Sequence, residues 1–86
     1  MIVFVPREDW DAERGEIYFP VSVIGTTVMC RVEAAAIDCE MAGGEALLAA
    51  FRAQRQDYEA RIRRKLLQGQ YEADRSVLIR AVELAP

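Results

Sequence analysis

The stretch Glu45–Gln68 constrains the fold most, because its apolar side chains recur with the period of a helix. At about 100° per residue they fall on one stripe about 100° wide, as expected for a helix packed on a core. They are Leu47, Leu48, Phe51, Tyr58, Ile62 and Leu66. Gly69 follows and suits the left-handed conformation that often ends helices. The sequence therefore predicts one long helix over Glu45–Gln68, with the rest of the chain folded against it.

The apolar segments of the first half of the chain have the patterns of short strands. Ile2–Val5 is rich in β-branched and aromatic residues, which favour strands. In Glu16–Ile24 and Thr27–Val32, apolar residues alternate with others on either side of a tight turn, which predicts a hairpin. Pro20 has no N–H to donate, so we expect an edge, a bulge or an unpaired position there.

Three further segments complete the predicted fold. Val77–Leu84 alternates and predicts a last strand, and the alanine-rich segment Glu33–Met41 predicts a short helix. Arg7–Gly15 is polar around Trp10 and predicts a loop or a single helical turn. The sequence thus predicts one α+β domain over residues 1–86. In it, a small antiparallel sheet of three to four strands packs against one long helix, with a short helix before it, in the order β-β-β-α-α-β.

The charge is unevenly distributed along the 86 residues, whose formal net charge is −3. Residues 1–43 carry three basic and eight acidic side chains, whereas residues 44–86 carry eight basic and six acidic ones. The negative total argues against a general nucleic-acid binder. The asymmetry favours pairing between the two halves, or head-to-tail attraction between copies.

The residue types that are absent narrow the chemistry. The chain has no histidine, and its two cysteines, Cys30 and Cys39, form no CxxC motif. The commonest general base and the commonest metal ligand are therefore missing, and we expect no metal or cofactor. The chain shows no pattern of a signal peptide and no apolar run of about 18 residues, so we expect no membrane span. These features favour a cytoplasmic protein with reduced thiols.

One charged residue, Arg55, falls inside the apolar stripe of the predicted helix. The first interpretation is that Arg55 pairs with Glu59, one turn later, or with an acidic residue of the N-terminal loop. The alternative is a pocket in which the guanidinium group holds an anion. Trp10 is expected to close one end of the core or, alternatively, to stack on a ligand. Trp10, Arg55 and Glu59 are therefore the candidate functional or structural group.

The preferred function is a small protein-interaction or regulatory module without catalysis. The missing catalytic motifs favour it, as does the last predicted strand, which is apolar on both faces. One face carries Val77 and Ile79, and the other carries Leu78 and Val82. A second copy of the chain or an unknown partner could cover the face that the core does not use.

Two alternatives depend on charged clusters. The first is a nucleic-acid-binding accessory protein that contacts phosphates through basic residues of the long helix: Arg61, Arg64 and Lys65. Basic residues surround that helix and do not form one stripe, so a solvated helix face is the simpler interpretation. The second is a small enzyme, or an anion-binding domain centred on Arg55 and Trp10. An enzyme would use the acidic cluster Asp9, Asp11 and Glu13.

Several short motifs resemble a small bacterial family of proteins of unknown function, number 1488 among the domains of unknown function. The matching segments are Pro6–Asp11, Glu13–Arg14, Ile17–Pro20, Gly25 with Cys30, Phe51–Arg55 and Tyr58–Glu59. The resemblance covers nearly the whole chain and implies a compact α+β fold, but it supplies no mechanism. Gln54 stands where many relatives are expected to have a histidine. This difference weakens any acid–base role for the position before Arg55.

Overall fold

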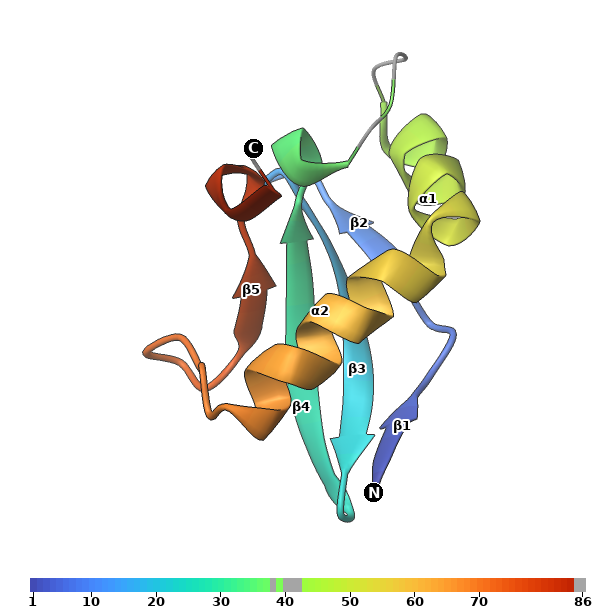
Figure 1. The fold of residues 1–86 in the computed structure, drawn as a ribbon. Helices are drawn as coiled ribbons and strands as arrows, with labels where there is room; N and C mark the ends of the chain where they lie inside the picture. Colours follow the sequence, from blue (N-terminus) through green and yellow to red (C-terminus); the bar gives the residue numbers. More distant parts are fainter. Residues whose placement is uncertain (38, 40–42, 85–86) are drawn as a thin grey trace.

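The computed structural model describes residues 1–37, 39 and 43–84 and contains a mixed five-stranded sheet with helices on one side (Figure 1). The strands are β1 (Ile2–Phe4), β2 (Asp9–Asp11), β3 (Glu16–Val23), β4 (Thr26–Glu33) and β5 (Val77–Ile79). The helices are α1 (Gly44–Ala53) and α2 (Arg55–Leu67), and the 3-10 turns are η1 (Ala34–Ala36) and η2 (Ala81–Leu84). The predicted α+β class is confirmed, with one or two more strands than expected.

The hairpin of β3 and β4 forms the centre of the sheet, as the alternating pattern predicts. The two strands pair antiparallel over their whole length, and Ile24 and Gly25 make the turn. Ile17, Phe19 and Val21 point to the helix side and are fully buried. Their buried partners on β4 include Cys30, where burial raises the pKa of the thiol to about 12.

A single interrupted edge runs along the outer side of β3. β1 and β2 both pair antiparallel with β3, with Phe4 opposite Val21 and Asp9 opposite Tyr18. Between these two pairings, residues 5–8 of the edge lie opposite only Phe19 and Pro20 of β3. Because proline has no N–H, this interruption lies where a ladder bond could not form, which agrees with the unpaired position, one of the three features that the sequence predicts at Pro20. The loop predicted over Arg7–Gly15 is wrong in part, since it contains β2.

The prediction of one helix over Glu45–Gln68 is wrong, because the chain forms two helices that meet at Gln54. The backbone of Gln54 leaves the helical region (φ −114°, ψ 16°), and its N–H bonds to the carbonyls of Ala50 and Phe51. The bend directs Phe51 and Tyr58 toward the same core, where their rings stack with centres 5.3 Å apart. The apolar stripe has a gap between these two rings, which marks the break in the sequence.

The C-terminal segment differs from its prediction in length and in pairing. β5 ends at Ile79, and the backbone N–H of Ala81 then donates to Oε1 of Glu33 (2.9 Å) as η2 begins. β5 runs parallel to β4, because the chain crosses over through α1 and α2. Leu78 is also buried, so this strand does not offer the spare apolar face that the sequence suggests.

The short helix predicted over Glu33–Met41 is only the one-turn η1, Ala34–Ala36. Ile37, which follows it, is already extended and buried. Three alanines add helix propensity but no large apolar stripe, so a longer helix would have little to pack. Residues 38 and 40–42 of that prediction lie outside the described residues.

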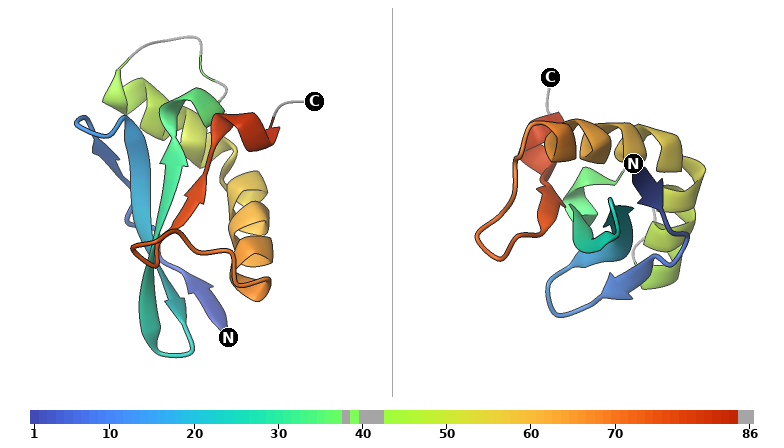
Figure 2. Two further views of the ribbon diagram at one scale, coloured as in Figure 1. Left: turned by 90° about the vertical axis from the view of Figure 1, so that its left-hand side faces the viewer. Right: turned by 90° about the horizontal axis from the view of Figure 1, so that it is seen from below.

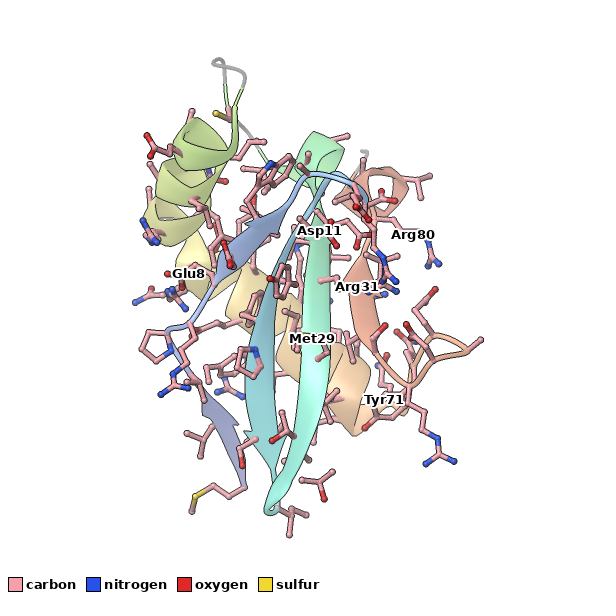
Figure 3. All side chains as sticks on the ribbon, turned by 180° about the vertical axis from the view of Figure 1, so that it is seen from behind. Glu8, Asp11, Met29, Arg31, Tyr71 and Arg80 are labelled. Atoms are coloured by element: carbon pink, nitrogen blue, oxygen red, sulfur yellow. The ribbon has the colours of Figure 1, made fainter. Side chains whose placement is uncertain are left out.

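The fold has two layers, the sheet and the helices, and the helices lie on only one side of the sheet (Figure 2). α2 lies across one face of the sheet, and α1 lies beside β2 at its edge (Figures 1 and 2). Of the described elements, no helix covers the opposite face of β3 and β4 (Figure 3). We call that side the open face. Within residues 1–37, 39 and 43–84, no helix is long and apolar enough to span a bilayer.

Candidate functional site

Arg55 lies at the junction of the two helices and is held by carboxylates on two sides. The side chain of Glu8 reaches this junction from the interruption between β1 and β2 and is only 7% exposed. It forms an ion pair with Arg55 and accepts a hydrogen bond from Nε of Arg52 (2.9 Å). Glu59 lies 3.6 Å from Arg55, and the Arg55 guanidinium lies 5.3 Å from the ring centre of Phe51. Arg55 thus has the two kinds of partner that the ion-pair interpretation predicts.

Trp10 lies at the other end of α1 and packs against the first turn of that helix. It is opposite Ile17 in the sheet and contacts the buried core. A Cβ added to Gly44 would lie 2.5 Å from Cδ1 of Trp10, so the ring rests directly on the helix backbone. The ten residues of α1 separate Gly44 from Arg55 by about 15 Å. The structure therefore does not bring Trp10 and Arg55 into one site.

Gly44→Ala is expected to displace Trp10, the chain's single tryptophan. Alanine normally stabilises a helix relative to glycine by about 1 kcal/mol, but here its Cβ would overlap the indole ring. We expect a net loss of roughly 1–3 kcal/mol in the free energy of unfolding and a red-shifted tryptophan emission. Urea titration followed by fluorescence measures both.

The control for that substitution is Ala49→Gly, at an exposed position of the same helix. It should lower stability by about 1 kcal/mol without moving the emission maximum. A Gly44→Ala protein that is more stable than the parent, with unchanged emission, would show that the indole does not rest on Gly44.

The acidic side chains around β2 are engaged in local hydrogen bonds. Oδ1 of Asp11 accepts the backbone N–H groups of Glu13 (3.1 Å) and Arg14 (3.2 Å), as in an Asx turn. Oδ2 of Asp9 accepts the hydroxyl of Tyr18 (3.4 Å), and the negative charge of Asp9 raises the pKa of that tyrosine. Among the described residues, no group of three or more acidic or thiol side chains is placed to hold a metal ion. These bonds explain the acidic cluster as the turn that ends β2.

The three basic residues proposed to contact phosphates do not share one exposed patch. Arg61 and Arg64 are exposed and line a shallow hollow of about 250 Å³ together with the acidic Asp57. Lys65 is half-buried and has an interaction of its own. The geometry therefore gives a pair of arginines beside a carboxylate, not a protruding cationic cluster.

A buried polar network lies on the open face and was not found from the sequence (Figure 3). Arg31 of β4 donates two hydrogen bonds to the carboxylate of Glu16 (3.0 and 3.2 Å) and two to Oγ of Ser76 (3.1 and 2.9 Å). Ser76 in turn donates to Oδ1 of Asp74 (2.6 Å). Glu16 and Ser76 are buried, at 7% and 5% exposure.

This network joins β3, β4 and the loop before β5. Nε, Nη1 and Nη2 of Arg31 all have partners within the chain, so the guanidinium is a fixed part of the fold. Hydrogen bonds from the side chain and backbone of Ser76 lower the pKa of Asp74 below its ordinary value. The sequence signal is slight, because it consists only of the charged residues Glu16 and Arg31 at open-face positions of β3 and β4.

Comparison with known proteins identifies the family. The family model described as a protein of unknown function, DUF1488, matches residues 2–79. A solved structure of a DUF1488 protein of unknown function from Shewanella loihica PV-4 is similar, with a TM-score of 0.85 and 18% sequence identity. The similarity covers 91% of this chain and 90% of that one. No curated protein matches. The chain belongs to the DUF1488 family, as its sequence motifs suggest.

Proposed function

We propose that the protein is a small cytoplasmic module that binds another protein chain without catalysing a reaction, and that it binds through the open face. The observation that carries this proposal is the two-layer fold, which leaves the centre of the sheet without a covering helix (Figure 3). Apart from Glu16 and Arg31 of the polar network, the residues of β3 and β4 on this face are exposed or half-buried and uncharged: Tyr18, Pro20, Ser22, Thr27 and Met29. They form a mixed, mostly uncharged surface with an aromatic ring and a thioether near its centre.

The shape of the open face supports docking. Two hollows of about 440 and 290 Å³ adjoin there, and both are lined by Arg14, Met29 and Arg31. Tyr18 lines the first and Ser76 the second. Side chains of a partner could enter on either side of Met29, whose flexible thioether adapts to different surfaces.

The floor of these hollows is rigid, which favours binding. Arg31 is held by Glu16 and Ser76, so its position is fixed before a partner arrives. A preorganised surface loses less conformational entropy on association than a mobile one. The use of the acidic cluster in a local turn supports a role without catalysis. Cys30 and Cys39 are not joined by a disulfide, which supports a reducing compartment.

The test is site-specific photo-crosslinking in cells that produce the protein at its natural level. A benzoyl-phenylalanine replaces Met29 on the open face or, as the matched control, the exposed Gln56 on α2. We expect protein adducts from position 29 and none of the same mass from position 56. Equal adducts from both positions, or none from position 29, would overturn the proposal. The adduct mass identifies the partner as a second copy or as a different protein.

A further inference from the structure

The turn of the β3–β4 hairpin carries a residue that neither its conformation nor its packing favours. Ile24 has φ 49° and Gly25 has φ 79°, as in a type I′ turn, which prefers asparagine, aspartate or glycine at the first position. A β-branched residue with positive φ is a true outlier and strained. The side chain of Ile24 is 81% exposed, so burial within the chain does not offset this strain.

The half of β4 next to this turn is an open sheet edge. β5 pairs with β4 only over Cys30–Val32, so Thr26–Met29 have β3 on one side and no described strand on the other. In the left view of Figure 2, this part of the hairpin extends past the loop that leads into β5. Thr26, Thr27 and Met29 are exposed there. Their backbone can accept a further strand.

This edge lacks the features that usually prevent pairing with another chain. Natural edge strands are commonly protected by charged side chains or by proline. Here no charged residue occurs between Glu16 and Arg31, and β4 contains no proline. The exposed Ile24 at the turn and Met29 near the middle of β4 add apolar surface along this edge. Conformational strain, an unprotected edge and exposed apolar side chains thus coincide in one short segment.

We propose that this segment pairs antiparallel with the same segment of a second copy, so that two sheets join about a twofold axis. The inference rests on the proposed interaction role and names a partner for it. An antiparallel edge is complementary to itself, because donors and acceptors alternate along it. When two copies are related by a twofold axis, a segment close to the axis packs against the same segment of the other copy. An uncharged segment therefore meets no charge repulsion when it pairs with itself. If α2 instead packed against α2 of a second copy, Arg61 and Arg64 would face the same arginines.

The same arrangement gives Ile24 a place to bind. In an antiparallel pair, the turn of one copy lies near the far end of the segment in the other. There the smaller hollow, of about 290 Å³, lies between Met29 and the loop that carries Asp74 and Ser76. Each copy would insert its Ile24 toward the partner's hollow, and the exposed apolar surface of both copies would be covered.

Sedimentation equilibrium of the full chain over a wide concentration range tests this inference, with three variants. We expect a monomer–dimer equilibrium that stops at two copies, and an association constant lowered by about tenfold or more in Thr27→Lys. Val3→Lys is the matched control, because it places the same charge on the open face at the opposite sheet edge. It should leave association unchanged. Ile24→Asn should weaken association and raise the melting temperature, since asparagine suits the turn.

The outcomes separate the two proposals. A wild-type protein that stays monomeric at the highest concentration, or a Thr27→Lys protein that dimerises as well as wild type, overturns the self-association. If the position-29 crosslinks then contain a different protein, the proposed interaction role stands alone. If position 29 gives no adduct in cells while the purified chain dimerises and Thr27→Lys weakens the dimer, the interaction role is wrong at the natural level of the protein, and the edge pairing stands only as a property of the chain at higher concentration.

Discussion

Arg31→Ala is expected to lower the free energy of unfolding by about 3–5 kcal/mol, because it leaves the buried carboxylate of Glu16 without its partner. The substitution also removes both donors that bind Ser76. Urea unfolding followed by far-UV circular dichroism measures the change. Arg14→Ala is the control, because Arg14 is exposed and lies 3.9 Å from Asp11, so its loss should cost less than about 1 kcal/mol.

An equal, small loss in both variants would show that the Arg31 network does not hold the sheet together.

A second readout of the same network is the dependence of the free energy of unfolding on pH. The pKa of Asp74 is lower in the folded state than its ordinary value of 3.8, so its ionised form stabilises the fold at neutral pH. That contribution is lost as the pH falls below about 4 and through the lowered pKa. Asp74→Asn should therefore reduce the decline in stability over this range.

Arg55→Ala should destabilise the protein by about 3 kcal/mol, because Glu8 would remain buried at the helix junction without its main cation. The stacking of the guanidinium on Phe51 is lost as well. Thermal and urea unfolding measure the effect. Arg52→Ala is the matched control, since Arg52 binds the same carboxylate from a side chain that is 55% exposed, and a loss of less than about 1 kcal/mol is expected.

A double-mutant cycle with Glu8 distinguishes the ion pair from general loss of packing. If Arg55 acts mainly through Glu8, Glu8→Ala combined with Arg55→Ala should cost much less than the sum of the single substitutions. Additive losses would mean that the two side chains act separately. Arg55 would then be available for the anion site that the sequence also allowed.

The hairpin and the helix stripe could be predicted because local pattern decides them. β3 and β4 alternate over their whole length, and Gly25 marks their turn. The break at Gln54 could not be predicted in the same way, since neither glycine nor proline is present there. Glu8, which binds Arg55 beside the break, is distant from it in the sequence, and helix periodicity does not show such a contact.

β2 and the Arg31 network escaped prediction for related reasons. In β2 a single apolar residue, Trp10, lies between two aspartates, which is too short a pattern to show alternation. Arg31 and Ser76 are 45 positions apart and meet only because β5 pairs parallel with β4. Sequence periodicity places each residue on a face, but it does not select which strands become neighbours. The Arg31 network therefore could not be found from a sequence motif, because it depends on which strands lie side by side in the sheet.

The parallel pairing of β5 has a consequence for synthesis on the ribosome. Val77 and Ile79 are fully buried and complete the core against β4, yet they follow every other strand and both helices along the chain. A nascent chain can form the β3–β4 hairpin early, but its buried side cannot close until β5 has left the exit tunnel. Until then Cys30 and Val32 lack their neighbours, and the hairpin edge is open to other chains along its full length. Chaperone contact should therefore be strongest with nascent chains in which the hairpin has emerged but β5 is still inside the exit tunnel.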